Sequence, residues 1–238
     1  MTREHVLPRW LHRALNITGE ITLSTQDREI RRASALDVTV RGVCGPCNNG
    51  WMHDLENGFR TLMLGPLHGL PASLTTADQT IVATWGIKTW LLLETAFAHE
   101  RGGRVISDGT LAWLREHNEP PGDYEVRLGH LNAERRQIMW TSTIPCFQRT
   151  DQPPIGAVGV FTIANLVFHI WAPIYSPDRP DAQMYSLGIG QRFAPFFLRV
   201  WPNEVEEVRW PPQGIFRIED LDREWPPNKS FILQPVPL

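Results

Sequence analysis

Residues 158–174 read VGVFTIANLVFHIWAPI, an apolar run rich in β-branched and aromatic side chains. The run is too long for one ordinary strand, because strands usually span about three to ten residues. Ala164 and Asn165 interrupt it near the middle, and asparagine is typical of turns. We therefore predict two strands that meet near Ala164 and Asn165. His169 in the second strand is predicted to be a buried residue with satisfied hydrogen bonds rather than a ligand.

An alternating pattern extends this β-rich region in both directions along the chain. Tyr124, Val126, Leu128 and His130 alternate with other residues, several of them charged, which is typical of a strand with one buried face. Most of the 20 prolines lie at or after Pro145, and proline interrupts long helices. We expect a β-rich C-terminal unit built from short strands and ordered turns.

The middle of the chain has a helical pattern instead. Apolar side chains recur from Thr76 to Phe97, and Thr76 with Gln79 matches the capping box that begins many helices. A second, shorter helix is predicted from Ser107 and carries Leu111. This region is interpreted as scaffold.

Composition and charge exclude several classes of protein. The 238 residues are 42% hydrophobic and 21% charged, as in ordinary globular proteins. The net charge of −3 means that contact with nucleic acid needs a local basic patch. Three cysteines are too few for a secreted disulfide framework, and charged residues near Met1 argue against a signal peptide. Charges within the apolar run 81–98 argue against a membrane span. We expect a cytoplasmic protein with no membrane association.

The first chemical motif is Glu4-His5-x-x-Pro8. A carboxylate is a hard oxygen ligand, and the neighbouring imidazole, with an ordinary pKa of about 6.5, is suited to take a proton from water. Adjacent side chains of a strand point to opposite sides, so both reach one site only where the strand ends. Pro8 favours such an ending.

The second motif follows about forty residues later, as Cys44-x-x-Cys47-Asn48-Asn49. Apolar residues recur at helical spacing from Trp51 onward, which predicts a helix that begins just after Cys47. Asn48 and Asn49 would then lie at a helix N-terminus, where asparagine is a favoured cap.

In this order and spacing the two motifs resemble those of the HNH endonucleases, the ββα-metal or His-Me finger nucleases. The resemblance covers roughly residues 1–65. It implies that residues 1–65 form a ββα finger. With the patterns described above for the rest of the chain, we expect an α+β protein in which residues 66–238 form a helical and antiparallel β-rich domain of unknown role. The implied function is metal-dependent hydrolysis of phosphodiester bonds.

The resemblance also implies roles for individual residues. His5 would be the general base that activates water, and Glu4 and Asn48 would be ligands of one divalent cation, Mg²⁺ or Mn²⁺. His53 lies one residue from the position of a further ligand and faces Asn49 on a helix, so it is an additional candidate ligand. So few protein ligands would leave coordination positions open for water and phosphate.

Cys44 and Cys47 supply only half of a tetrahedral zinc site, and zinc-bearing relatives have a further cysteine pair before the acidic-His element. We therefore do not expect a structural Zn²⁺, unless Cys146 or His12 completes the site. A redox pair and two small buried residues in a tight turn are the alternatives. The central asparagine of the family's pattern is not identifiable in this chain.

Arg28, Arg31 and Arg32 lie between the motifs, where relatives approach the nucleic-acid backbone, although the acidic residues among them also suit a solvated loop. Two other functions remain open. One is a non-catalytic binding protein on a degenerate finger, whose aromatic C-terminal region binds a protein or small-molecule partner. The other is an enzyme of another class with its pocket in the β-rich region. For the C-terminal region in general, a protein partner or a second copy is the expected contact.

Overall fold

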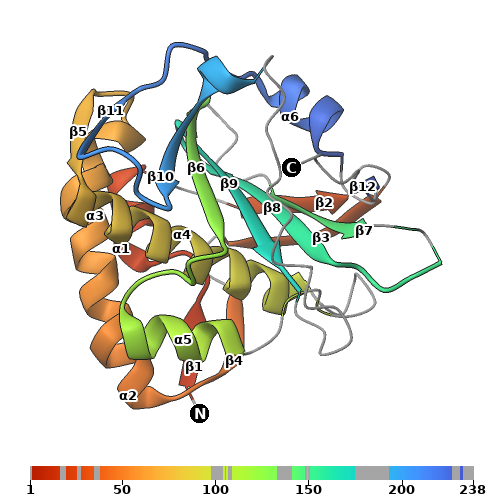
Figure 1. The fold of residues 1–238 in the computed structure, drawn as a ribbon. Helices are drawn as coiled ribbons and strands as arrows, with labels where there is room; N and C mark the ends of the chain where they lie inside the picture. The colour runs from red at the N-terminus through yellow and green to blue at the C-terminus, as the bar shows by residue number, and fades with distance from the viewer. Residues whose placement is uncertain are drawn as a thin grey trace.

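The protein has an α+β architecture, as predicted, with a central sheet and helices on both of its faces (Figure 1). The computed structural model describes residues 2–16, 20–25, 28–34, 38–97, 104, 106, 109–132, 141–147, 149, 151–174, 193–226 and 231–232.

The central sheet has the strand order β10-β6-β9-β8-β7-β12. Its strands are β6 (Glu125–His130), β7 (Thr141–Phe147), β8 (Gly156–Ile163), β9 (Leu166–Pro173), β10 (Phe197–Trp201) and β12 (Phe231–Ile232). Neighbours are antiparallel except β12, which runs parallel to β7. A turn at Ala164 and Asn165 joins β8 to β9, with Ala164 at a φ of 49°. The predicted division of the apolar run is confirmed.

Helix α4 (Thr76–Phe97) crosses one face of this sheet (Figure 1). Two glycines allow a close approach between helix and sheet. Gly86 of the helix lies against the ring of Phe168, and Gly159 of β8 lies against the ring of Trp90, where an added Cβ would come within 2.2 Å of the indole. The packing of α4 on the sheet therefore depends on residues without a side chain.

The opposite face of the sheet is covered by α6 (Ile218–Glu224) and the aromatic residues beside it. Because both faces are covered, every residue of β8 and β9 is buried. His169 is 1% exposed between Phe197 and Trp225, and burial lowers its pKa to about 3. Its predicted burial is confirmed, but neither ring nitrogen has a hydrogen-bond partner among the described residues, so the predicted satisfaction is wrong.

The N-terminal part forms two paired strands followed by a helix. Strand β1 (Thr2–His5) pairs antiparallel with β4 (Thr39–Val43). Strand β4 leads into the short helix α2 (Gly45–Cys47), the π-helical turn η2 (Asn48–Met52) and the helix α3 (His53–Leu67).

Smaller elements complete the described chain. They are α1 (Arg9–Ala14), β2 (Glu20–Thr25), β3 (Arg28–Ser34), β5 (Ala72–Thr75), α5 (Gly109–His117), η4 (Ala194–Phe196) and β11 (Glu207–Trp210). Strand β2 pairs with β3, and β5 with β11. The second predicted helix corresponds to α5, which begins at Gly109, and its predicted start at Ser107 lies outside the described residues.

The N-terminal cap of α4 differs from the prediction. The amide of Thr75 donates to Oδ2 of Asp78 at 2.9 Å, and the amide of Asp78 donates to Oγ1 of Thr75 at 3.4 Å. This reciprocal pair lies one residue before the predicted pair of Thr76 and Gln79. The side chain of Gln79 is buried and donates to the carbonyl of Leu74 at 3.1 Å, so it cannot serve as the capping residue.

One hydrophobic cluster joins the N-terminal elements to α4 and the sheet. The ring of Phe59 in α3 stacks on Trp85 of α4 with centroids 3.7 Å apart, and Trp85 lies 5.8 Å from Phe168 of β9. The predicted boundary between residues 1–65 and 66–238 falls within α3, which continues to Leu67. The finger and the sheet therefore share a core.

Candidate catalytic and metal-binding site

Strand β1 ends at His5, as the position of Pro8 predicted. In the pairing with β4, Glu4 lies opposite Val40 and His5 lies opposite Thr39. The His5 side chain is half-buried, so part of it reaches solvent. The acidic and basic members of the first motif are thus held at the end of a paired strand.

Glu4 faces the protein interior and is only 6% exposed. Burial raises its pKa to about 7, because water no longer solvates the charged carboxylate. The ammonium of Lys88 acts in the opposite direction and lowers the pKa, whereas the carboxylate of Glu56 raises it further. Glu4 therefore lies close to a charged pair contributed by α3 and α4.

Lys88 of α4 and Glu56 of α3 form an ion pair in which the Lys88 side chain is buried and that of Glu56 is partly buried. The Lys88 ammonium donates to Oε1 of Glu56 at 2.7 Å, and the Lys88 side chain is 0% exposed. The same ammonium lies 5.9 Å from the centroid of the Trp85 ring. A buried charge is tolerated when it is paired in this way. The charges of this pair act on the carboxyl group of Glu4.

His5 lies near a second imidazole, that of His12 on α1. Burial lowers the pKa of His12, and the charge of His5 lowers it further. His12 is 5% exposed, and its Nε2 has no hydrogen-bond partner among the described residues. Each residue of the first motif therefore has titratable neighbours of its own. Lys88 and Glu56 act on Glu4, and His5 acts on His12.

The helix that carries Asn48 begins earlier than predicted. Cys44 is its N-cap, since Sγ of Cys44 accepts a hydrogen bond of 3.1 Å from the amide of Cys47. Pro46 occupies the first turn, where its missing amide hydrogen costs no hydrogen bond. The amide of Asn48 already donates to the carbonyl of Cys44 at 3.0 Å. The predicted capping role of Asn48 and Asn49 is therefore wrong.

The helix is interrupted at Gly50, where φ is −106° and ψ is −113°. Asn48 precedes this kink and His53 follows it, so the kink sets their relative orientation. Nε2 of His53 lies 3.0 Å from Nδ2 of Asn57, one turn further along α3. His53 therefore has a hydrogen-bond partner on α3, and its role as an additional cation ligand stays a prediction.

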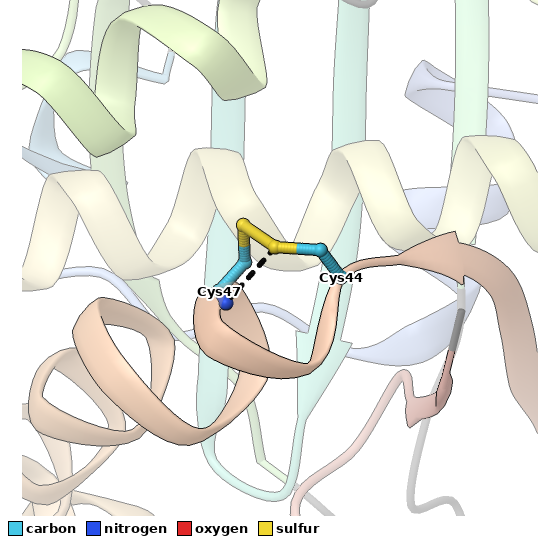
Figure 2. The surroundings of a disulfide bond; sticks show 2 residues. All are labelled: Cys44 and Cys47. Atoms are coloured by element: carbon cyan, nitrogen blue, oxygen red, sulfur yellow. Dashed lines mark hydrogen bonds between the residues drawn. A yellow bond between two sulfur atoms is a disulfide. The ribbon is translucent and has the colours of Figure 1, made fainter.

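Cys44 and Cys47 form a disulfide with a Cα–Cα distance of 5.2 Å (Figure 2). Cys44 is exposed and Cys47 half-buried, so the interpretation as two buried residues in a tight turn is wrong. Bonded sulfurs are not thiolates, so the pair cannot bind Zn²⁺ in this state. Cys146 cannot complete the site, because it lies in the cluster beneath α6, whereas Cys47 contacts the cluster on the other face.

No group of three or more His, Cys, Asp or Glu side chains that could hold a metal ion occurs within the described part of the chain. A site with one carboxylate and one amide ligand would not form such a group. No hydrogen bond joins Asn48 to Glu4 among the described residues. The predicted convergence of Glu4, His5 and Asn48 therefore stays a prediction.

Arg28, Arg31 and Arg32 lie on strand β3, opposite Thr25, Leu23 and Thr22 of β2. The alternative of a solvated loop is therefore wrong for the backbone of this segment. Their side chains lie outside the described residues.

Sequence reasoning missed Glu56 and Lys88. A signal was present, since Lys88 interrupts an apolar helical run and a buried lysine requires a carboxylate partner. The identity of that partner depends on how α3 packs against α4, which no local pattern specifies.

None of the described helices is both long and apolar enough to cross a membrane. In comparisons with known proteins the chain matches no family model, no curated protein and no solved structure.

Proposed function

We propose that the chain is a metal-dependent nuclease of the HNH type, which hydrolyses phosphodiester bonds. The pairing of β1 with β4 supports this proposal most directly. It places the strand that ends in Glu4 and His5 beside the strand that leads into the helix bearing Asn48. Two motifs far apart in sequence thus belong to one ββα unit.

The donor atoms suit a hard divalent cation. Glu4 and Asn48 would hold Mg²⁺ or Mn²⁺ through carboxylate and amide oxygens, which these ions prefer. His53 would join them only by leaving its contact with Asn57. When bound, the cation would stabilise negative charge on the scissile phosphate and on the leaving oxygen.

His5 supplies the proton acceptor in this proposal. It is half-buried at the end of β1, so its ring is both held by the strand and reached by solvent. A neutral imidazole accepts a proton from water near neutral pH. We further propose that the nuclease acts in the cytoplasm on nucleic acid, and that its C-terminal region contacts a protein partner or a second copy.

A plasmid-nicking assay tests the proposal. The wild-type chain and His5→Ala are each incubated with supercoiled DNA and with structured RNA in the presence of Mg²⁺, Mn²⁺ or Zn²⁺. Wild type should cleave with at least one cation and His5→Ala should lose at least 100-fold in rate. His117→Ala is the matched control, because His117 is an exposed histidine on α5 and should keep full activity.

A second candidate function is a binding protein on a degenerate finger. Lys88 favours this alternative. Its ammonium neutralises the carboxylate of Glu56 and acts on Glu4, so carboxylate charge near Glu4 is balanced without a cation. Under this alternative neither wild type nor His5→Ala cleaves any substrate with any of the three cations. Equal cleavage by wild type and His5→Ala would instead indicate an enzyme whose pocket lies elsewhere, as in the β-rich region.

A further inference from the structure

A groove of about 940 Å³ lies between α1 and the C-terminal half of α3, on the side of the molecule where both helices are seen in Figure 1. We call it the α1–α3 groove. The lining residues that carry the argument are Trp10, Arg13, Arg60, Leu64, His68 and Leu70.

The charged side chains that line the groove all have the same sign. They are Arg13 and Arg60; the His68 ring lines the groove as well, and no Asp or Glu does so among the described residues. Neither Arg13 nor Arg60 has a carboxylate partner within the described part of the chain. The groove is therefore a local basic patch on a chain whose net charge is −3.

The groove also exposes apolar surface. Leu64 and Leu70 are 38% and 59% exposed, which is unusual for large apolar residues in this protein. The Arg60 guanidinium lies 5.8 Å from the centroid of the Trp10 ring, and this contact restrains its position at the groove. Arg13 and Arg60, which have no described carboxylate partner, thus lie beside exposed apolar side chains.

The position of the groove relates it to the proposed base. Strand β1 ends at His5, and α1 begins at Arg9 after the short link through Pro8. Arg13 belongs to that helix, so the element that lines the groove follows directly from the strand that carries His5.

We propose that the α1–α3 groove binds single-stranded nucleic acid, with Arg13 and Arg60 on its phosphates and the apolar lining against its bases. Single strands offer unstacked base faces, which a duplex hides in its stack. The inference rests on the proposed nuclease function and names the form of its substrate.

Fluorescence anisotropy tests this inference without any need for cleavage. Labelled 20-mers of single-stranded DNA, single-stranded RNA and duplex DNA are titrated with protein in EDTA at several salt concentrations. The double variant Arg13→Ala/Arg60→Ala should bind single strands about 25-fold more weakly at 0.1 M salt, and its salt slope should fall by about 1.4, at about 0.7 per lost phosphate contact. Arg13→Lys/Arg60→Lys should recover most of the affinity.

The matched control is Arg115→Ala/Arg149→Ala, which removes two exposed arginines far from the groove in sequence and should change affinity less than 2-fold. Leu64→Ser should weaken single-strand binding more than duplex binding. Circular dichroism checks the fold of each variant. Because the substituted positions are exposed, each variant should give the spectrum of wild type.

The inference would be overturned if Arg13→Ala/Arg60→Ala bound single strands as tightly as wild type does. It would also be overturned if wild type bound polyglutamate more tightly than either single strand. His5→Ala should bind as wild type does. Groove-dependent binding without cleavage would therefore reject the nuclease and keep the groove, whereas cleavage that is indifferent to Arg13 and Arg60 would reject the groove alone.

Discussion

The ammonium of Lys88 donates a 2.7 Å hydrogen bond to Glu56, and the Lys88 side chain is wholly removed from solvent. The pair joins α4 to α3, and its two charges shift the pKa of Glu4 in opposite directions. Glu4 is itself buried, so the free energy of its charged form is sensitive to both of these charges. The stability of the N-terminal elements therefore depends on the charge states of Glu4, Glu56 and Lys88.

Removal of the ammonium should destabilise the fold strongly. Lys88→Met leaves the carboxylate of Glu56, whose side chain is only 15% exposed, without its ammonium partner. The expected loss is about 3 kcal/mol in the free energy of unfolding, at the lower end for a buried pair. Urea denaturation at pH 7 measures the effect. Arg149→Ala, which removes an exposed partner of Asp151, should cost less than about 1 kcal/mol. Similar losses in the two variants would contradict the role given to Lys88.

The raised pKa of Glu4 makes stability depend on pH. Its pKa is about 7 in the folded chain and near 4.5 when unfolded. Between these values the folded state binds more protons at this site, so this group's contribution to stability is complete below about pH 4.5 and is lost as the pH rises toward 7. Glu4→Gln mimics the protonated form and removes that dependence.

Urea denaturation of wild type and Glu4→Gln at pH 5 and pH 8 measures this effect. The free energy of unfolding of Glu4→Gln, relative to that of wild type, should be higher at pH 8 than at pH 5. An equal difference at both pH values would show that Glu4 titrates normally.

The approach of α4 to the sheet should depend on Gly159. A Cβ there would lie 2.2 Å from the Trp90 indole, whose Nε1 donates to Oγ1 of Thr143 at 2.9 Å and is thereby held in place. Gly159→Ala should cost at least about 1–3 kcal/mol in thermal or urea unfolding. Gly122→Ala is the matched control, because an added Cβ meets nothing within 4 Å. Equal stability of the two variants would show that the helix lies further from the sheet.

The state of the cysteines can be read by thiol labelling. Without a reductant, native protein should show no reactive thiol at Cys44 or Cys47, and a small dithiol should expose both. Cys146 should stay unlabelled until the chain unfolds, because it is fully buried and burial raises its pKa to about 12. Purified chain that contains one equivalent of zinc and no disulfide would instead restore the zinc interpretation of the pair.

Sequence alone predicted the features that local chemistry determines. The break at Ala164 and Asn165 follows from strand length and turn propensity, and the end of β1 follows from Pro8. The cap of α4 was placed one residue late because Thr75 and Thr76 offer the same hydroxyl, and only the buried position of Gln79 decides between them.

The surroundings of Glu4 were beyond sequence reasoning for a different reason. The charges of Glu56 and Lys88 act on it from two helices that meet through the stacking of Phe59 on Trp85. Such a cluster depends on tertiary packing between distant segments. The α1–α3 groove also depends on tertiary packing, because Arg13 and Arg60 lie far apart in the sequence.

The convergence of Glu4, His5 and Asn48 on one cation is tested most directly by anomalous diffraction. Crystals of His5→Ala with an uncleaved oligonucleotide and Mn²⁺ should give one strong anomalous peak, bound by the Glu4 carboxylate, the Asn48 amide oxygen and a phosphate oxygen. A peak held by other residues, or an oligonucleotide bound without any peak beside Glu4, would contradict the proposed metal site.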